Sequence, residues 1–282
     1  RYRKWISNYG QSYGEWAEPA DVKDFAISEF VCPHPEETTA YIVLLMERMS
    51  EIAALLGKYS EAARYTDFGN KVREGYQHLM EAPKFSLDTD RQAKLIRPLH
   101  LDLLTGQQAE YAQKRLLQAL DNYGWRLGTG FLSTPFILDV LTKMDVEYAY
   151  RLLENEELPG WLCMPKQGAT TIWENWEGPN THKPASLNHY SKGAVCRWVF
   201  DSMCGIHVDR ENHFIIAPRP GGRFSHAKAS YRSIYGLVES GWEKAEAGFV
   251  FTVTVPANCT AAVFLPGGQE LAQESGTQVY TV

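Results

Sequence analysis

The sequence lacks long apolar runs and clusters of basic residues, and each absence excludes a class of protein. No run approaches the ~20 consecutive apolar residues that a membrane-spanning helix needs. The net charge is −6, from 34 acidic and 28 basic residues, and no group of Lys and Arg marks a site for a phosphate backbone. We therefore expect neither a membrane nor a nucleic acid as a partner.

Cysteine is scarce and has no diagnostic spacing. The five cysteines are odd in number and scattered, so they match neither a disulfide framework nor a zinc site. They are predicted to be small buried residues: Cys32, Cys163, Cys196, Cys204 and Cys259. The spacings His-x-x-x-His and Cys-x-x-Cys do not occur either. The sequence thus predicts no metal and no cofactor.

Helical periodicity fills most of the first 200 residues. Apolar residues recur at helical spacing over residues 37–56, and Gly57 follows as a helix-ending glycine. Ser60 can start a second helix, which ends before Pro83, so the two predict an αα-hairpin. Further helices are predicted over residues 95–104, 107–120, 133–142, 146–154 and 191–203.

After about Gly205 the pattern changes to alternation of apolar and polar residues, which is typical of strands. Strands are predicted over residues 213–217, 223–231, 236–244, 248–255, 260–265 and 278–282. The predicted fold is therefore mainly α with an all-β tail, divided into residues 1–204 and residues 205–282. Helix pairs followed by a β sandwich suit an α/α toroid, in which the loops at one end form a cleft.

Three polar and aromatic stretches fall in the predicted loops. They are SYGEW at residues 12–16, WENWE at residues 173–177 and SLNHY at residues 186–190. Glu174 lies between Trp173 and Trp176, and partial desolvation by the two rings would favour its neutral form and suit it to act as a base near neutral pH. The plainer interpretation is a solvated loop acid, with His189 as an ordinary polar residue at a helix entrance. The clustering of all three stretches in one class of loop favours a site.

Together with two further motifs, these stretches resemble a known family. YGEW (13–16), TGFLST (129–134), TTIWENW (170–176), SLNHY (186–190) and PRPGG (218–222) occur in the order found in the bacterial α-L-rhamnosidases of glycoside hydrolase family 78. The resemblance covers nearly the whole chain, and the Trp-Glu-x-Trp and Leu-Asn-His-Tyr motifs are its most specific part.

The resemblance implies an incomplete (α/α)6 barrel followed by a C-terminal antiparallel β sandwich. It also implies hydrolysis of terminal α-L-rhamnose from rhamnosides or polysaccharides, with inversion at the anomeric carbon. By position, Glu174 matches the general base that activates water, and His189 matches a histidine that contacts the rhamnose. The same resemblance assigns substrate-binding roles to Trp173, Trp176, Glu15 and Trp16.

One departure from the family pattern changes the expectation for activity. Family members carry an Asp-Cys-Pro-Gln-Arg-Asp-Glu stretch whose Glu is the general acid, and this stretch does not occur here. We therefore expect a C-terminal part of a longer enzyme, with the general acid upstream, that is nearly inactive by itself. The alternatives are a carbohydrate-binding fragment and an α/α-toroid polysaccharide lyase that uses His189 and Tyr190. The substrate class predicts a periplasmic or secreted protein, with the cytoplasm as the alternative, and oligomeric state is left open.

Overall fold

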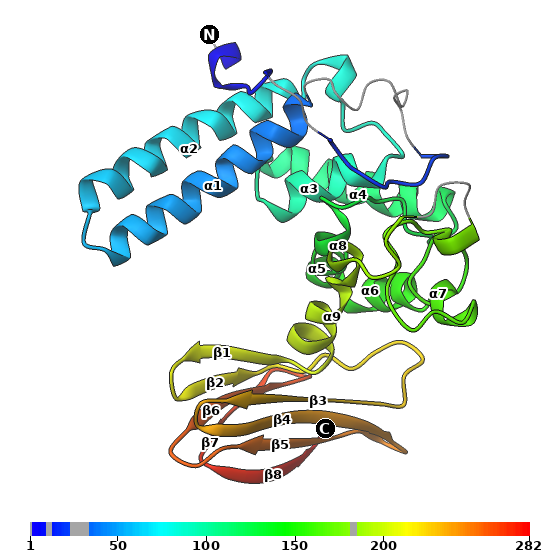
Figure 1. The fold of residues 1–282 in the computed structure, drawn as a ribbon. Helices are drawn as coiled ribbons and strands as arrows, with labels where there is room; N and C mark the ends of the chain where they lie inside the picture. The colour runs from blue at the N-terminus through cyan, green and yellow to red at the C-terminus, as the bar shows by residue number, and fades with distance from the viewer. Residues whose placement is uncertain (1, 10–12, 23–33, 181–184) are drawn as a thin grey trace. The chain divides into compact units, whose positions relative to one another are not determined.

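The computed structural model describes residues 2–9, 13–22, 34–180 and 185–282 (Figure 1). The chain divides into two compact units, one of residues 1–140 with 155–192 and the other of residues 141–154 with 193–282. The predicted division after residue 204 instead follows the change from helix to strand along the chain. That boundary remains a prediction.

The first unit is helical. It contains α1 (Pro35–Leu55), α2 (Tyr59–Leu79), α3 (Gln92–His100), α4 (Gly106–Asn122) and α7 (Cys163–Lys166), with short 3-10 turns at η1 (Tyr2–Trp5), η3 (Pro83–Phe85) and η4 (Gly178–Asn180). Helix α5 (Thr134–Met144) begins in this unit, and α8 (Tyr190–Gly193) lies at its end.

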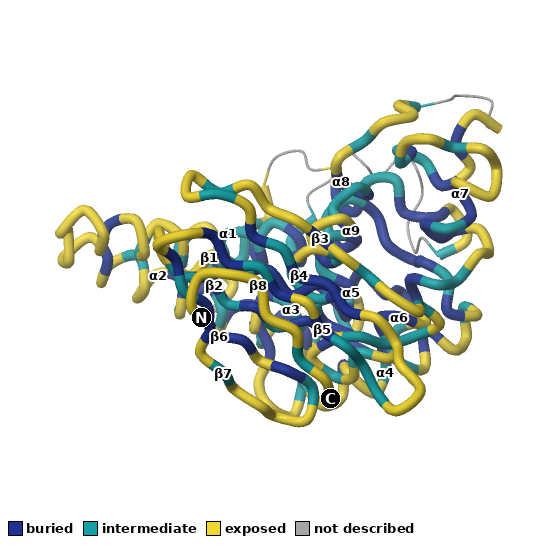
Figure 2. The backbone as a smooth tube through the Cα atoms, turned by 90° about the horizontal axis from the view of Figure 1, so that it is seen from below, coloured by how far each residue is buried: buried dark blue, intermediate teal, exposed yellow. Residues whose placement is uncertain are grey.

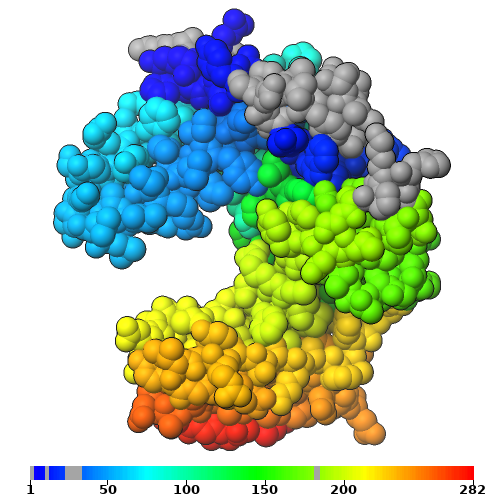
Figure 3. Space-filling view, in the orientation of Figure 1, coloured from blue at the N-terminus to red at the C-terminus, as the bar shows by residue number. Residues whose placement is uncertain are grey.

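The predicted αα-hairpin is confirmed in α1 and α2. Gly57 ends the first helix with φ at +71°, a conformation that glycine adopts without strain, and α2 begins one residue before Ser60. Figures 2 and 3 show the hairpin extending from the rest of its unit, and its far end is exposed. Several large apolar side chains on it face solvent, among them Leu45, Ile52, Leu55 and Leu56.

Local hydrogen bonds explain where α4 begins. Thr105 precedes the helix, and its hydroxyl accepts a bond from the Gln108 N–H at 3.3 Å, while the Gln108 side chain accepts from the Thr105 N–H at 3.0 Å. This reciprocal pair is a capping box, which satisfies two backbone donors that the helix itself cannot. The helix predicted over residues 107–120 is therefore confirmed and begins slightly earlier.

The second unit joins a few helical segments to two sheets. The helical segments are α6 (Val146–Leu153), α9 (Val195–Trp198) and the π-turn η5 (Val199–Met203). The strands are β1 (Ile206–Arg210), β2 (His213–Ile216), β3 (His226–Ser233), β4 (Gly236–Ala245), β5 (Gly248–Val255), β6 (Thr260–Leu265), β7 (Gln269–Gln273) and β8 (Gly276–Thr281).

The single helix predicted over residues 191–203 is wrong, because the chain there forms α8, α9 and η5 in succession. In the last of these the Cys204 N–H bonds to the Val199 carbonyl at 3.0 Å, one residue further back than in an α-helix. Two carbonyls at this end accept bonds from β4, from Trp242 Nε1 at 2.8 Å to Met203 and from Ser240 Oγ at 2.6 Å to Cys204. Tertiary hydrogen bonds therefore accompany a local geometry that apolar periodicity does not predict.

The two sheets have strand orders β1-β2-β6-β7 and β3-β4-β5-β8. Pairing is antiparallel except between β2 and β6, which run parallel. Buried side chains from both sheets form the core, including Phe214, Val263, Trp242 and Phe251. The predicted β tail is thus confirmed, with one parallel pair inside it.

Strands β1 and β7 were missed by the sequence prediction. They are the two edges of their sheet, and most of their side chains are exposed or half-buried. Edge strands need few apolar residues, so the alternation that marks a strand is weak in IHVDR and QELAQ. Cys196 also departs from expectation: it is exposed, whereas Cys163, Cys204 and Cys259 are buried, and Cys32 lies outside the described residues.

Candidate active site

Backbone hydrogen bonds hold two of the predicted motifs side by side in the first unit. The Glu174 N–H donates to the Ser186 carbonyl at 2.9 Å, and the His189 N–H donates to the Ile172 carbonyl at 2.8 Å. The segments around residues 172–174 and 186–189 therefore form one local element. Glu174 and His189 thus lie on two paired backbone segments.

The Glu174 carboxylate is half-buried and is held from two directions. Its Oε1 accepts a bond from the indole Nε1 of Trp16 at 3.2 Å, and its Oε2 accepts one from the Ser186 N–H at 3.0 Å. Trp16 lies 158 residues away along the chain, so the structure joins two loops that the sequence shows only as separate motifs. An ionised carboxylate has about four lone-pair sites, so these two donors leave it able to accept a proton from water.

Aromatic rings surround His189. Its imidazole stacks on Phe131, with ring centroids 4.3 Å apart, and on Tyr190 at 5.0 Å. The Ser191 N–H donates to His189 Nδ1 at 3.3 Å, which favours the neutral tautomer with its proton on Nε2. His189 can then donate from Nε2 to a hydroxyl group.

Two tyrosines near these groups are strongly exposed. Tyr13 is 71% exposed and packs its edge against Trp16, with centroids 5.5 Å apart, while Tyr190 is 84% exposed. Exposed rings with polar tips suit contact with a sugar, which has both C–H faces and hydroxyls. Tyr13 and Phe131 were not assigned to the site from sequence, and Tyr190 was assigned only in the lyase alternative, although each lies within a quoted motif.

Trp173 and Trp176 lie inside the protein, with 4% and 1% of their surface exposed. The Trp176 Nε1 donates to the Thr129 carbonyl at 3.4 Å, and the ammonium of Lys192 lies 3.6 Å from the centroid of its ring. Gly178 packs directly on Trp173, since a Cβ there would lie 2.1 Å from the indole. Burial therefore favours packing beneath the Glu174 loop over the sugar contact predicted for these two rings.

Glu15 is also fully buried, with 0% exposed. Its oxygens accept bonds from the N–H groups of Gly130 and Ser133, from the Ser133 hydroxyl and from the Arg97 guanidinium. These four donors match the roughly four lone-pair sites of a carboxylate. This placement favours a structural role for Glu15 over the predicted contact with substrate, whereas Trp16 beside it reaches Glu174.

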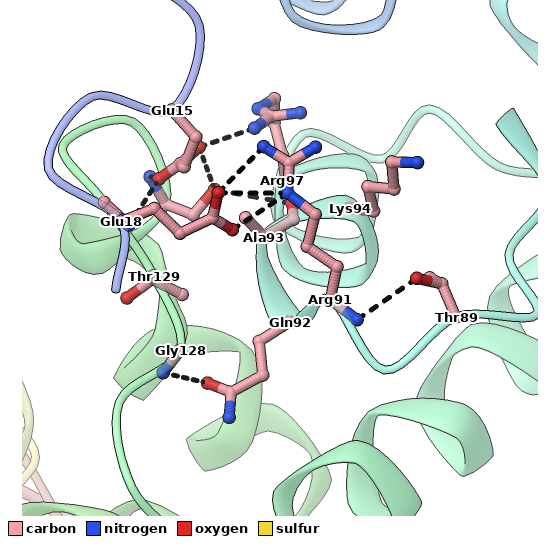
Figure 4. A network of polar contacts seen from close by, with 12 residues as sticks. Glu15, Glu18, Thr89, Arg91, Gln92, Ala93, Lys94, Arg97, Gly128 and Thr129 are labelled. Atoms are coloured by element: carbon pink, nitrogen blue, oxygen red, sulfur yellow. Dashed lines mark hydrogen bonds and ion pairs between the residues drawn. The ribbon is translucent and has the colours of Figure 1, made fainter. Parts of the chain in front are cut away.

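Behind Glu15 lies a cluster of buried charges (Figure 4). Arg91 binds both oxygens of Glu18, with its Nε 2.9 Å from Oε1 and its Nη2 2.9 Å from Oε2. Arg91 Nη1 lies 3.5 Å from Glu36, and Arg97 Nη2 lies 3.7 Å from Glu37. Among the described residues, with Glu15, this cluster holds more carboxyl groups than guanidinium groups, an excess of acid that favours protonation of part of it.

The excess of carboxyl groups predicts a dependence of stability on pH. Burial raises the pKa of Glu18 to about 8 against the opposing pull of Arg91, and burial together with Glu37 raises the pKa of Glu36 to about 7, both from 4.5. These groups bind protons more tightly in the folded protein, so their contribution is complete below pH 4.5 and is lost as pH rises through 7 and 8. We expect the free energy of unfolding to fall by ~2–4 kcal/mol over that range.

Urea unfolding at several pH values between 5 and 8 measures this slope. Glu36→Gln carries no ionisable group at that position and is expected to remove about half of the decline. The control is Glu61→Gln, which replaces an exposed glutamate on α2 and should leave the slope unchanged. A stability that rises from pH 5 to pH 8 would contradict the prediction.

The described residues support neither a metal site nor a membrane-spanning helix. Among them, His, Cys, Asp and Glu form no group of three that could hold a metal ion. In the same part of the chain, no helix has both the length and the apolar character to cross a bilayer. The prediction that no cofactor takes part stays a prediction.

Models of two protein domains match the chain. The bacterial alpha-L-rhamnosidase 6 hairpin glycosidase domain matches residues 1–203, and the bacterial alpha-L-rhamnosidase C-terminal domain matches residues 212–279. Among curated proteins, an alpha-L-rhamnosidase of Streptomyces avermitilis is 33% identical over 263 residues, and one of Formosa agariphila is 31% identical over 291 residues. These matches cover 90% and 94% of this chain.

Solved structures agree with these matches. The crystal structure of the Streptomyces avermitilis alpha-L-rhamnosidase complexed with L-rhamnose aligns with 99% of this chain, with a TM-score of 0.85 and 30% identity. The alpha-L-rhamnosidase of Dictyoglumus thermophilum aligns with 98% of it, with a TM-score of 0.86 and 26% identity. The likeness confirms the predicted fold class, a helical barrel part followed by a β sandwich.

The chain is much shorter than the proteins it matches. It spans 24% of the Streptomyces avermitilis relative and 30% of the Formosa agariphila relative, and 29% and 34% of the two aligned structures.

Proposed function

We propose that this chain, which belongs to the family of the bacterial alpha-L-rhamnosidase 6 hairpin glycosidase domain, is part of an enzyme that removes terminal α-L-rhamnose from rhamnosides. The observation that carries the proposal is the Glu174 carboxylate, held by Trp16 and Ser186 on a segment whose backbone is paired with that of His189. A relative in this family has been crystallised with L-rhamnose, which gives the sugar its identity.

In the proposed mechanism Glu174 is the general base. Its two bonds fix the carboxylate while leaving lone pairs for a water, which it would deprotonate as the water attacks the anomeric carbon. His189 would donate from Nε2 to a rhamnose hydroxyl, and Tyr13 and Tyr190 would offer ring surface to the sugar. With the attacking water on the side opposite to the leaving group, the configuration at the anomeric carbon inverts.

An inverting glycosidase also needs a carboxylic acid that protonates the leaving oxygen, about 6.5–9.5 Å from the base. Glu15 is unsuited to this role because Arg97, Ser133 and the Gly130 N–H hold it as a buried anion. We propose that the acid belongs to polypeptide outside this chain. The expected substrates, plant glycosides and polysaccharides, favour a periplasmic or secreted location.

Hydrolysis of aryl glycosides by the full-length protein tests the proposal. We expect release of rhamnose from an aryl α-L-rhamnoside at least ~10²-fold faster than release of fucose from the matched aryl α-L-fucoside, because a pocket with placed hydrogen-bonding groups rejects the wrong hydroxyl pattern. Proton NMR during the reaction should show the β anomer of rhamnose first. The α anomer appearing first would contradict inversion.

Two further measurements distinguish the proposed function from the two alternatives. Binding of L-rhamnose, measured by titration calorimetry, without any hydrolysis would favour a carbohydrate-binding fragment. Ultraviolet absorbance from an unsaturated sugar, formed from a uronate polymer, would favour a lyase that uses His189 and Tyr190. Either result would replace the proposed function.

A further inference from the structure

We propose that Glu15 is a positioning residue, which acts on the reaction through Trp16 although no sugar can reach it. Its carboxylate joins the loop of residues 13–18 to the loop of residues 128–134. Each loop carries one aromatic ring that touches a proposed site residue. The effect on catalysis rests on the proposed function, whereas the effect on Trp16 can be measured without it.

Glu15 bonds to one loop through both of its oxygens. Its Oε1 accepts from the Gly130 N–H at 3.0 Å and the Ser133 N–H at 2.7 Å. Its Oε2 accepts from the Ser133 hydroxyl at 2.9 Å and from Arg97 Nη2 at 2.6 Å. Bonds from charged or backbone donors to a buried carboxylate are among the stronger ones in proteins. The negative charge therefore fixes the loop of residues 128–134 from inside.

The two loops touch along their backbones as well. The Phe131 N–H donates to the Trp16 carbonyl at 2.8 Å. At Gly130 a Cβ would lie 2.3 Å from that same carbonyl oxygen, so only glycine permits this approach. The path of the chain at Trp16 is thus set by its contact with residues 130 and 131.

The rings on the two loops reach the two proposed site residues. Trp16 donates its indole N–H to Glu174 Oε1 at 3.2 Å, and Phe131 stacks on His189 at 4.3 Å. A loosened Glu15 would let both rings move away from these partners. Because the Trp16 N–H is one of the two donors that hold the Glu174 carboxylate, its loss would leave the base less well positioned.

Glutamine at position 15 is the sharpest replacement. Glu15→Gln keeps the size of the side chain but has one acceptor oxygen and one NH2 group, so its NH2 would face a donor from Ser133, Gly130 or Arg97. The matched control is Glu18→Gln. Glu18 is 3% exposed and lies on the same loop, but its carboxylate is bound to Arg91 instead of to the loop of residues 128–134.

A double-mutant cycle in the full-length protein tests whether Glu15 acts through Trp16. We expect Glu15→Gln and Trp16→Phe each to lower kcat by ~10-fold or more. The kcat of the double variant should lie within ~3-fold of that of the less active single variant, because the effects of residues that act as a unit are not additive. In the control cycle, the fold-changes of Glu18→Gln and Trp16→Phe should multiply.

A fold-change of the Glu15→Gln and Trp16→Phe double variant equal to the product of the single effects would overturn the proposal. If Glu15→Gln does not fold, as judged by near-UV circular dichroism, Ser133→Ala takes its place, since it deletes one donor to Glu15 and leaves the charge. Multiplying effects of Ser133→Ala and Trp16→Phe would overturn the proposal in the same way.

A second measurement does not depend on activity. In protein labelled with 15N-tryptophan, the signal that disappears in Trp16→Phe identifies the indole N–H of Trp16. We expect this N–H to exchange with solvent at least ~10-fold faster in Glu15→Gln than in the unaltered protein, since its bond to Glu174 would open more often. An unchanged rate would overturn the proposal even if the protein does not hydrolyse rhamnosides, and absence of hydrolysis with faster exchange would count only against the proposed function.

Discussion

Replacing Glu174 with glutamine is expected to lower kcat for an aryl α-L-rhamnoside by about 10²–10⁴-fold, the range found when a general base is removed. Glutamine has nearly the same shape and can still accept one bond from Trp16 or Ser186, which now hold the two carboxylate oxygens. It cannot take a proton from water. Binding of L-rhamnose is therefore expected to change little, because the loss lies in the chemical step.

The control for this prediction is three residues away in the same loop. Glu177 is exposed on the surface, so Glu177→Gln should leave kcat within about 2-fold of the unaltered protein, as most exposed positions do. Steady-state kinetics and calorimetric titration with L-rhamnose measure the two effects separately. An unaltered kcat in Glu174→Gln would reject the base assignment, and loss of rhamnose binding would show that Glu174 acts mainly as a contact.

The second large effect is expected in stability. Arg97 is 0% exposed and lies 2.6 Å from Glu15 and 3.7 Å from Glu37. Burial by itself would lower the pKa of Arg97, but the carboxylates of Glu37 and Glu15 raise it above its ordinary value, so the guanidinium stays charged. Arg97→Met would leave these carboxylates buried without that charge. We expect the free energy of unfolding to fall by about 3–5 kcal/mol.

Arg48→Met is the control, since Arg48 Nη1 donates to both oxygens of Glu51 in a pair whose side chains are more than half exposed. Exposed ion pairs contribute little, so this variant should lose less than about 1 kcal/mol. Urea unfolding followed by circular dichroism measures both. Equal losses of unfolding free energy in Arg97→Met and Arg48→Met would contradict the prediction that a buried ion pair costs more to break than an exposed one.

The sequence allowed helices α1 to α6 and most strands to be predicted because their patterns are local. Gly57 ends α1, and Phe249, Phe251 and Val253 alternate along β5. The break after α8 and the edge strands β1 and β7 were not predictable in this way. The structure of those regions depends on contacts with residues distant in the sequence or on exposure to solvent. Neither produces a periodic pattern in the sequence.

The same limit applies to the residues of the candidate site. Glu174 and His189 could be paired from their motifs, because both lie within one short stretch of chain. The burial of Glu15 could not be predicted, since its partners Arg97 and Ser133 lie 82 and 118 residues away. The family resemblance assigned Trp173 and Trp176 to the sugar, but an indole beside a carboxylate is equally compatible with packing in the interior beneath a loop.

The pairing of residues 172–174 with residues 186–189 has a consequence for which neighbouring changes the candidate site can tolerate. Glu174 and His189 stand on the two paired segments, and two backbone hydrogen bonds hold those segments together. Exposed residues between them, such as Glu177 and Pro179, take no part in these two bonds. Exchanges at such positions should therefore leave Glu174 and His189 in register, whereas Trp176 and Gly178, which pack in the interior, should not be exchanged.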